Sequence, residues 1–310
     1  MQRSELVVDD EGRLYHLGVL PREVSPHLVL VGDPARAERV ARRFVSVDHE
    51  VRRREFVTLT GCLPDGGPPV TVIGTGIGTD NVEIALIEAW AALSFDLESR
   101  MPLEQPPALT AIRVGTSGGA QRDVEIGTLC IAGAALGLDA TGPYFDVPVH
   151  PALEPLEQRA RVALEAAVRS GARFAQSFRP YAAPASALVT ETLREVAERK
   201  GESHEVGITV TAPGFYGASS RTLAGLTNTI PDIKAALATL RSGEMRVLNF
   251  EMESSLLFLL AQALGIEAGT VCPAISRPDL HGEVPPYAPR IEAAIDVALE
   301  TLQILCRRSA

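Results

Sequence analysis

The chain has 310 residues, a formal net charge of −10 and 46% hydrophobic residues. This length supports one large α/β domain or two smaller ones, and the acidic balance argues against a nucleic-acid partner. The four cysteines form no CxxC pair, so neither a zinc ribbon nor a redox pair is indicated. No apolar stretch approaches the ~18 residues of a membrane span, and the first residues lack an apolar signal core. We therefore expect a soluble, cytoplasmic protein with no membrane partner.

Short apolar runs ending in glycine alternate with helical patterns along the chain. The predicted strands are residues 27–32, 69–76, 109–115, 127–137, 207–212 and 269–276. The predicted helices are residues 34–44, 79–93, 152–171, 186–201 and 290–308. This alternation predicts an α/β fold with a mixed or parallel sheet, in a single domain over residues 1–310. Two segments near 96–108 and 138–152 are predicted to be loop insertions.

Glycine loops mark the places where ligand sites lie in such sheets, and they begin at Gly32, Gly74 and Gly115. The first loop enters a helix that carries Arg36 in its first turn, and a helix N-terminus with an arginine suits an anion. A plain strand-to-helix turn is the alternative. The second loop has GxGxG spacing, which matches neither a Rossmann fingerprint nor a P-loop. It indicates only a close approach of the backbone to a ligand or to another strand.

The third glycine loop follows an arginine in an apolar strand. Arg113 lies two residues before Gly115, the first residue of the sequence GTSGG, and a charged side chain in a buried strand needs a partner. The hydroxyl groups and unhindered amides of this loop are groups that hold phosphate, whereas a structural salt bridge is the alternative. Three arginines before the strand that begins "EFVTL" add positive charge, and Arg53 or Arg54 is a candidate for the same anion. Lysine is nearly absent, occurring only at Lys200 and Lys234.

Two glutamates, Glu251 and Glu253, bracket Met252 where a long apolar run begins. An ionised carboxylate accepts hydrogen bonds from both hydroxyl groups of a vicinal diol, such as that of ribose. Because residues i and i+2 do not share a helix face, both can serve one ligand only where the chain is irregular or entering a helix. The alternative is a pair of first-turn glutamates that complement the helix dipole.

These segments, in order, resemble the nucleoside phosphorylase family: "GDPARAERVA", "RREFVTLTG", "GTGIGTDNVEIALIE", "RVGTSGGAQ", "APGFYGASSR" and "NFEMESS". The resemblance covers most of the chain and is greatest to the uridine phosphorylase branch, through "YHLG", "FYGASSR" and "EMESS". Purine-type members carry a catalytic aspartate near Ser276-Arg277, and the arginine here speaks against that branch. The resemblance implies a single three-layer αβα domain with a mixed central β-sheet. It also implies phosphate-dependent cleavage of a nucleoside, uridine or a related pyrimidine nucleoside, to free base and ribose 1-phosphate.

The resemblance also implies roles for individual residues. The phosphate-binding positions are Gly32, Arg36, Arg113 and Thr116, together with Arg54 of a neighbouring subunit. The ribose-binding positions are Glu251, Met252 and Glu253, together with His16 of a neighbouring subunit. The base-binding positions are Phe215, Ser219, Arg221 and Arg277. The catalytic positions among all of these are Arg113, Arg221 and Glu253.

The resemblance further implies a homo-oligomer, a hexamer built as a trimer of dimers, because sites are shared between subunits. Inorganic phosphate is a co-substrate, no cofactor is needed, and no metal is expected beyond a monovalent cation at Glu55.

One departure from the family leaves the base open. Ser219 stands where uridine phosphorylases carry a glutamine, and serine cannot span both atoms of uracil's amide edge. Either another residue or water reads the base, or the base is not uracil. The alternatives are a purine nucleoside phosphorylase, a nucleosidase that uses water, and a non-catalytic nucleoside-binding protein. Because Arg36 and Arg113 are both present, phosphorolysis is favoured over hydrolysis.

Overall fold

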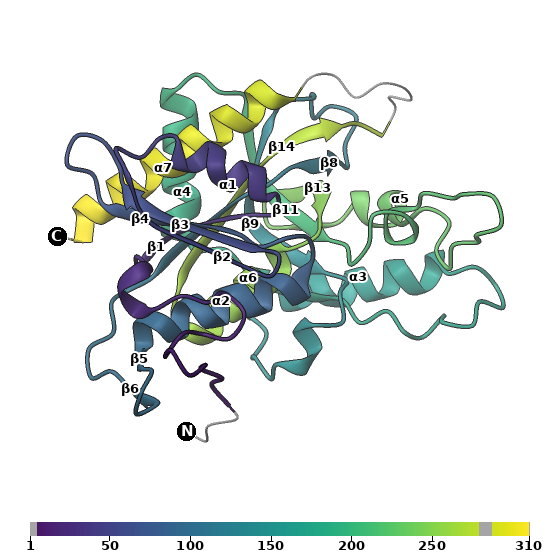
Figure 1. The fold of residues 1–310 in the computed structure, drawn as a ribbon. Helices are drawn as coiled ribbons and strands as arrows, with labels where there is room; N and C mark the ends of the chain where they lie inside the picture. The colour runs from purple at the N-terminus through teal and green to yellow at the C-terminus, as the bar shows by residue number, and fades with distance from the viewer. Residues whose placement is uncertain (1–4, 279–286, 310) are drawn as a thin grey trace.

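The apolar runs of the sequence form a mixed β-sheet in the computed structural model, which describes residues 5–278 and 287–309 (Figure 1). The strands are β1 (His27–Val31), β2 (Val47–Arg53), β3 (Phe56–Cys62), β4 (Pro69–Gly74), β5 (Phe95–Asp96), β6 (Met101–Pro102), β7 (Thr110–Val114), β8 (Ser117–Gly119), β9 (Leu129–Gly137), β10 (Tyr181–Pro184), β11 (His204–Thr211), β12 (Arg241–Ser242), β13 (Met245–Glu251) and β14 (Glu267–Ser276). The sheet order is β10-β9-β11-β13-β8-β14-β7-β1-β4-β3-β2, with β12 added to β13 and with β5 and β6 forming a separate ribbon.

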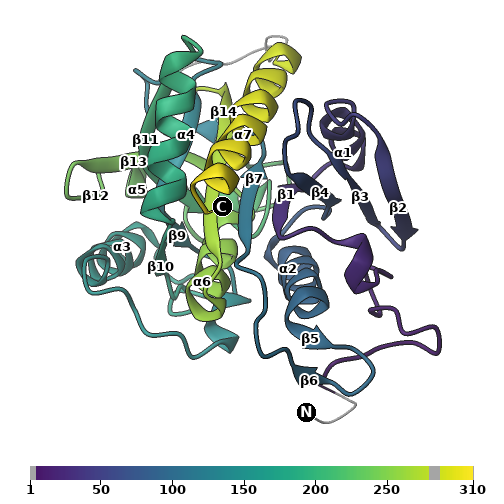
Figure 2. The ribbon, with the colours of Figure 1, turned by 90° about the vertical axis from the view of Figure 1, so that its left-hand side faces the viewer.

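Helices cover both faces of this sheet. The α-helices are α1 (Pro34–Ala41), α2 (Thr79–Ser94), α3 (Glu154–Ala167), α4 (Ala187–Arg199), α5 (Ile233–Ala238), α6 (Ser254–Leu264) and α7 (Ala288–Ser309). The 3-10 helices are η1 (Pro21–Glu23), η2 (Gly142–Tyr144) and η3 (Gly217–Ser219). Helices α1, α4 and α7 pack on one face, where α4 and α7 lie side by side, and α2 and α6 pack on the other (Figures 1 and 2). Helices α3 and α5 share a further apolar cluster with β9, β10, β11 and β13.

The central strands are apolar throughout because both of their faces are buried. In β1, all residues after His27 are buried, as expected for a parallel strand between two helical layers. Helix α6 is apolar on every side for the same reason, and it ends at Gly265 with a φ of 68°. Among the helices of the described residues, none combines the length and the hydropathy of a membrane span.

The predicted strands are all present, but the sequence did not reveal the hairpin of β2 and β3. The arginines of "VRRREF" were expected before a strand, whereas Arg52 and Arg53 lie within β2 and Arg54 lies at the hairpin turn with a φ of 54°. Strand β2 is an edge strand whose residues are mostly exposed, so it lacks the apolar run that marks a buried strand. The segment 96–108 contains part of the β5–β6 ribbon and 138–152 contains η2; that either is an insertion stays a prediction.

The sheet brings several loops to one edge. Strands β4, β1, β7 and β14 are parallel neighbours, and β11 pairs in parallel with β13. Within each group of parallel strands the carboxyl ends lie at one edge, so the loops that follow β1, β4 and β7 lie close together, as do those that follow β11 and β13. The loop after β1 turns into α1 through Asp33, whose carboxylate accepts a hydrogen bond from the amide of Ala35, and Pro34 opens the helix.

Candidate active site

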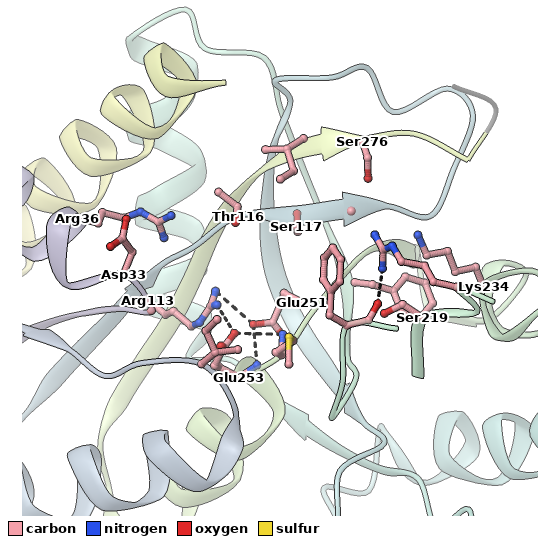
Figure 3. Close-up of a pocket in the computed structure, with 18 of the residues that line it drawn as sticks. Asp33, Arg36, Arg113, Thr116, Ser117, Ser219, Lys234, Glu251, Glu253 and Ser276 are labelled. Atoms are coloured by element: carbon pink, nitrogen blue, oxygen red, sulfur yellow. Dashed lines mark hydrogen bonds and ion pairs between the residues drawn. The ribbon is translucent and has the colours of Figure 1, made fainter. Parts of the chain in front are cut away.

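A cavity of about 570 Å³ opens at this edge of the sheet (Figure 3). Its walls come from the loops that follow β1, β4, β7, β11 and β13 and from the last two residues of β14, Ile275 and Ser276, and its volume is in the range of small-molecule sites. The structure brings together in these walls most of the residues expected from the sequence, namely Gly32, Arg36, Arg113, Thr116, Phe215, Ser219, Arg221, Glu251, Met252 and Glu253. All three predicted glycine loops contribute, the second through Ile77.

Arg36 is a buried cation without an ion pair among the described residues. Its side chain on α1 is 8% exposed, and its Nη1 donates a hydrogen bond to the carbonyl oxygen of Val114 at 3.2 Å. Its Nε has no hydrogen-bond partner. Burial and the nearby charge of Arg113 both lower the pKa of Arg36. A buried charge is costly unless an opposite charge offsets it, so this end of the cavity suits an anion.

Arg113, in contrast, is fully engaged by groups of its own chain. Its Nη2 pairs with Glu253, and its Nη1 lies 3.2 Å from Oε2 of Glu251 and 3.0 Å from Sγ of Cys272 (Figure 3). Burial opposes the charge of Arg113, but the two carboxylates outweigh burial and raise its pKa. Burial also raises the pKa of the Cys272 thiol to about 11. The structural salt bridge considered from the sequence is therefore present, at residues that also line the cavity.

Glu251 ends β13 and caps the helix that follows. Its carboxylate accepts hydrogen bonds from Oγ1 of Thr211 at 2.6 Å and from the amides of Glu253 and Ser254, each at 3.0 Å. These amides belong to the N-terminus of α6, where an acceptor with negative charge is favourable. Burial raises the pKa of Glu251, although Arg113 opposes that shift. The helix-dipole alternative thus describes Glu251, and its binding of ribose stays a prediction.

Glu253 is the N-cap residue of α6 and faces the second glycine loop. Its φ of −139° is not helical, so the chain is irregular between the two glutamates and enters the helix directly after Glu253, in agreement with the irregular or helix-entry backbone that their spacing indicated. Its Oε1 accepts from the amide of Gly78 at 3.0 Å, and its Oε2 accepts from the amide of Met252 at 3.1 Å and from Arg113. Each carboxylate oxygen has two lone-pair directions, so this buried group retains some capacity for sugar hydroxyls.

The other end of the cavity is formed by the loop after β11. The guanidinium of Arg221 lies 3.8 Å from the ring centroid of Phe215, and its Nη1 donates to the Phe215 carbonyl oxygen at 2.6 Å. The hydroxyl of Ser219 donates to the carbonyl oxygen of Gly214 at 3.2 Å. The half-exposed ring of Phe215 offers a flat apolar surface for a base. Arg221 and Ser219 thus each donate a hydrogen bond to a backbone carbonyl oxygen of their own loop.

Arg277 lines a neighbouring cavity of about 940 Å³. The two cavities share walls, among them Lys234 and Ser276. Lys234 was not anticipated as a site residue, because it lies in a short helix far from any glycine loop in the sequence. The one available signal was the rarity of lysine in this chain.

His16, Arg54 and Glu55 do not line the cavity of their own chain. Nδ1 of His16 lies 2.7 Å from Oε1 of Glu88, and the guanidinium of Arg54 lies 4.8 Å from the ring centroid of Tyr15, which packs edge-on against His16. His16 and Arg54 are thus joined through Tyr15 on a surface outside the cavity. Glu55 is exposed, and no group of three or more potential metal ligands gathers within the described ranges.

Comparisons with known proteins agree with this architecture. The chain is 32% identical to a uridine phosphorylase of Thermococcus kodakarensis over 264 residues, which cover 85% of this chain and 77% of that protein. It is 28% identical to a uridine phosphorylase of Haemophilus influenzae, covering 84% of this chain and 85% of that protein. Among solved structures, a Trypanosoma brucei nucleoside phosphorylase described as showing uridine phosphorylase activity superposes with a TM-score of 0.84 at 24% identity. That match covers 96% of this chain and 99% of the other.

The structural match confirms the predicted three-layer αβα fold with a mixed central sheet. The family model described as the phosphorylase superfamily matches residues 26–309. The resemblance to nucleoside phosphorylases, greatest to uridine phosphorylases, is confirmed by that match and by the relatives. The chain belongs to the phosphorylase superfamily.

Proposed function

We propose that this protein cleaves the N-glycosidic bond of a pyrimidine nucleoside of the uridine type with inorganic phosphate, releasing the free base and ribose 1-phosphate. The observation that carries the proposal is the buried guanidinium of Arg36, which has no ion pair among the described residues and lines the cavity. The uridine phosphorylases among its relatives supply the nucleoside class.

The layout of the cavity suits such a reaction. Phosphate lies against Arg36 and Thr116, ribose against Glu253, and the base against Phe215. Holding phosphate and nucleoside together lowers the entropic cost of their encounter. Phosphate attacks C1′ as the bond to the base breaks, and donors near the base stabilise the negative charge that it gains. Phosphate enters as a co-substrate, and neither a cofactor nor a metal is part of this proposal.

A panel of nucleosides tests the proposal directly. Uridine, thymidine, inosine and guanosine are incubated with the protein, with and without phosphate, and both base and ribose 1-phosphate are measured. We expect release from uridine that depends on phosphate and yields one ribose 1-phosphate per base. Release without phosphate would identify a nucleosidase, release from the purine nucleosides alone a purine phosphorylase, and binding without release a non-catalytic protein.

We also propose that Arg54 and His16 complete the site of a neighbouring subunit. The positive charge of Arg113 is offset by Glu251 and Glu253. At the end of the cavity where Arg36 and Arg113 lie, Arg36 is therefore the one arginine whose charge no described residue compensates. A phosphate dianion carries two negative charges, so a second positive charge near Arg36 would favour its binding. The surface that carries Arg54 also exposes the aromatic side chain of Tyr15, as contact surfaces between subunits do. The hexameric state and the cytoplasmic location remain predictions.

Complementation between two inactive variants tests this sharing. Arg54→Ala and Arg36→Met are each expected to be nearly inactive, and they are combined by co-expression. A mixed dimer then holds one intact site, made of Arg36 from one subunit and Arg54 from the other. Random mixing should restore about a quarter of the wild-type activity. Activity of the mixture no greater than that of the separate variants, with mixed oligomers demonstrated by differential tags, would contradict the sharing of sites.

A further inference from the structure

Lys234 places an ammonium group beside the base end of the cavity. It projects from α5, and Figure 3 shows Lys234 and Ser219 on the opposite side of the cavity from Arg36. Its Nζ lies 5.8 Å from the ring centroid of Phe250. A Cβ atom on Gly118 would lie only 3.6 Å from this Nζ and 3.1 Å from Oγ of Ser276. The ammonium and the Ser276 hydroxyl therefore face one space, which the glycine leaves open.

Within the part of the chain that the structure describes, this ammonium makes no polar contact. Across the described ranges, the structure gives Lys234 neither a hydrogen bond nor an ion pair. Burial lowers the pKa of Lys234, and the charge of Arg221 lowers it further. The neighbouring Asp232 opposes that shift only partly, because its carboxylate caps α5 by accepting from the amide of Ala235 at 2.9 Å. The other lysine, Lys200, is paired with Glu300 at 2.8 Å.

Lys234 is therefore a charged group at the base end whose donors have no acceptor among the described residues. Arg221 donates to the Phe215 carbonyl and stacks on that ring, and Ser219 donates to Gly214. We propose that Lys234 donates a hydrogen bond to a carbonyl oxygen of the departing base and stabilises the negative charge that develops there. This inference rests on the proposed function, and it names a group that supplies the donor, though not the acceptor, of the missing glutamine.

The chemistry requires such a donor. An oxygen of phosphate forms a bond to C1′, and the C1′–N1 bond breaks with its electron pair passing to the base. The pair delocalises onto the carbonyl oxygens, so the base leaves as an anion that afterwards takes a proton from water. A charged donor already in place, in a cavity partly shielded from water, stabilises that anion without reorganisation. Because an ammonium donates and does not accept, it selects for carbonyl oxygens on the base.

The test compares two substrates in three variants. Lys234→Met removes the donor, Lys234→Arg keeps a charged donor, and Lys200→Met removes the other lysine as a control. Each is assayed with uridine and with 5-fluorouridine, whose more acidic base leaves more readily. We expect Lys234→Met to lose about 100-fold in kcat/KM on uridine and clearly less on 5-fluorouridine. Lys234→Arg should recover part of the loss, and Lys200→Met should match wild type.

An equal loss on the two substrates would overturn the proposal, because a structural role does not depend on the leaving group. A Lys234→Met protein within about twofold of wild type on uridine would overturn it as well, and phosphorolysis itself would then still stand. A wild-type protein that releases no base from either substrate with phosphate would overturn the proposed function and this inference together.

Discussion

Replacing Arg36 with methionine should remove nearly all phosphorolysis while leaving the protein at least as stable as wild type. The guanidinium is buried and makes no ion pair within residues 5–278 and 287–309, so its removal leaves no carboxylate of these ranges uncompensated. Loss of the charged donor should lower kcat/KM by roughly 1,000-fold, with much of the loss appearing in the KM for phosphate. Methionine fills most of the vacated space, and the free energy of unfolding should stay the same or rise by about 1 kcal/mol. Steady-state kinetics and urea denaturation measure the two effects.

Arg39→Met is the matched control in the same helix. Arg39 points away from the cavity and pairs with Glu292, at 2.7 Å between its Nε and Oε1. Its loss should leave the kinetics unchanged and alter stability by less than about 1 kcal/mol. If Arg36→Met destabilised the protein by several kcal/mol, or if its KM for phosphate were that of wild type, Arg36 would be a structural residue and not the anion-binding group.

Replacing Arg113 with methionine, unlike replacing Arg36, should severely lower the free energy of unfolding. Arg113 lies between Glu251 and Glu253, and all three side chains are buried. Breaking a buried ion pair by removing one partner typically costs about 3–5 kcal/mol, because the remaining charge is left uncompensated. Activity should fall with stability, since Glu253 loses the group that orients it. Urea denaturation at fixed pH measures the loss.

The loss should also depend on pH in a defined direction. Burial already raises the pKa of Glu251 with Arg113 present, so the native state binds its proton more tightly than the unfolded chain does. Removing Arg113 strengthens that preference. The stability of Arg113→Met should therefore fall, relative to wild type, as the pH rises from about 5 to about 8.

A second substitution separates this explanation from simple loss of packing. Adding Glu253→Gln to Arg113→Met removes one uncompensated carboxylate and should recover part of the lost stability. If the double variant is less stable than Arg113→Met by the full cost of Glu253→Gln alone, the two residues are not coupled. A destabilisation that is independent of pH would likewise show that repulsion and burial of charge are not its cause.

The buried parts of this fold were predicted well from the sequence, because a strand that is buried on both faces appears there as a continuous apolar run. Apolar runs such as HLVLV, each followed by a glycine, predicted the positions of the strands. The glycines marked the loops that line the cavity. The edge strand β2 was not predicted, because its mostly exposed residues do not form an apolar run. Lys234 was missed because nothing local distinguishes a lysine in a short helix; only the fold brings it opposite Gly118.

The two glutamates show a different limit of sequence reasoning. Their spacing indicated correctly that the chain there is irregular or just entering a helix, but two carboxylates in one motif look alike in sequence. In the structure, Glu251 holds the helix N-terminus and Glu253 reaches Gly78 and Arg113. Thr211 donates a hydrogen bond to Glu251, and Gly78 donates one to Glu253. Because these two donors come from distant parts of the chain, the different roles of the carboxylates cannot be read from the motif itself.

The hydrogen bond from Gly78 to Glu253 joins segments that are 175 residues apart in sequence. The carboxylate of Glu253 is therefore oriented only when both halves of the sheet have assembled, and no local fragment of the chain can reproduce its position. Any compound that occupies the cavity is for this reason linked to global unfolding, and its affinity can be read as a rise in melting temperature. A library of nucleosides and nucleobase analogues can thus be ranked by thermal denaturation alone, before any turnover is measured.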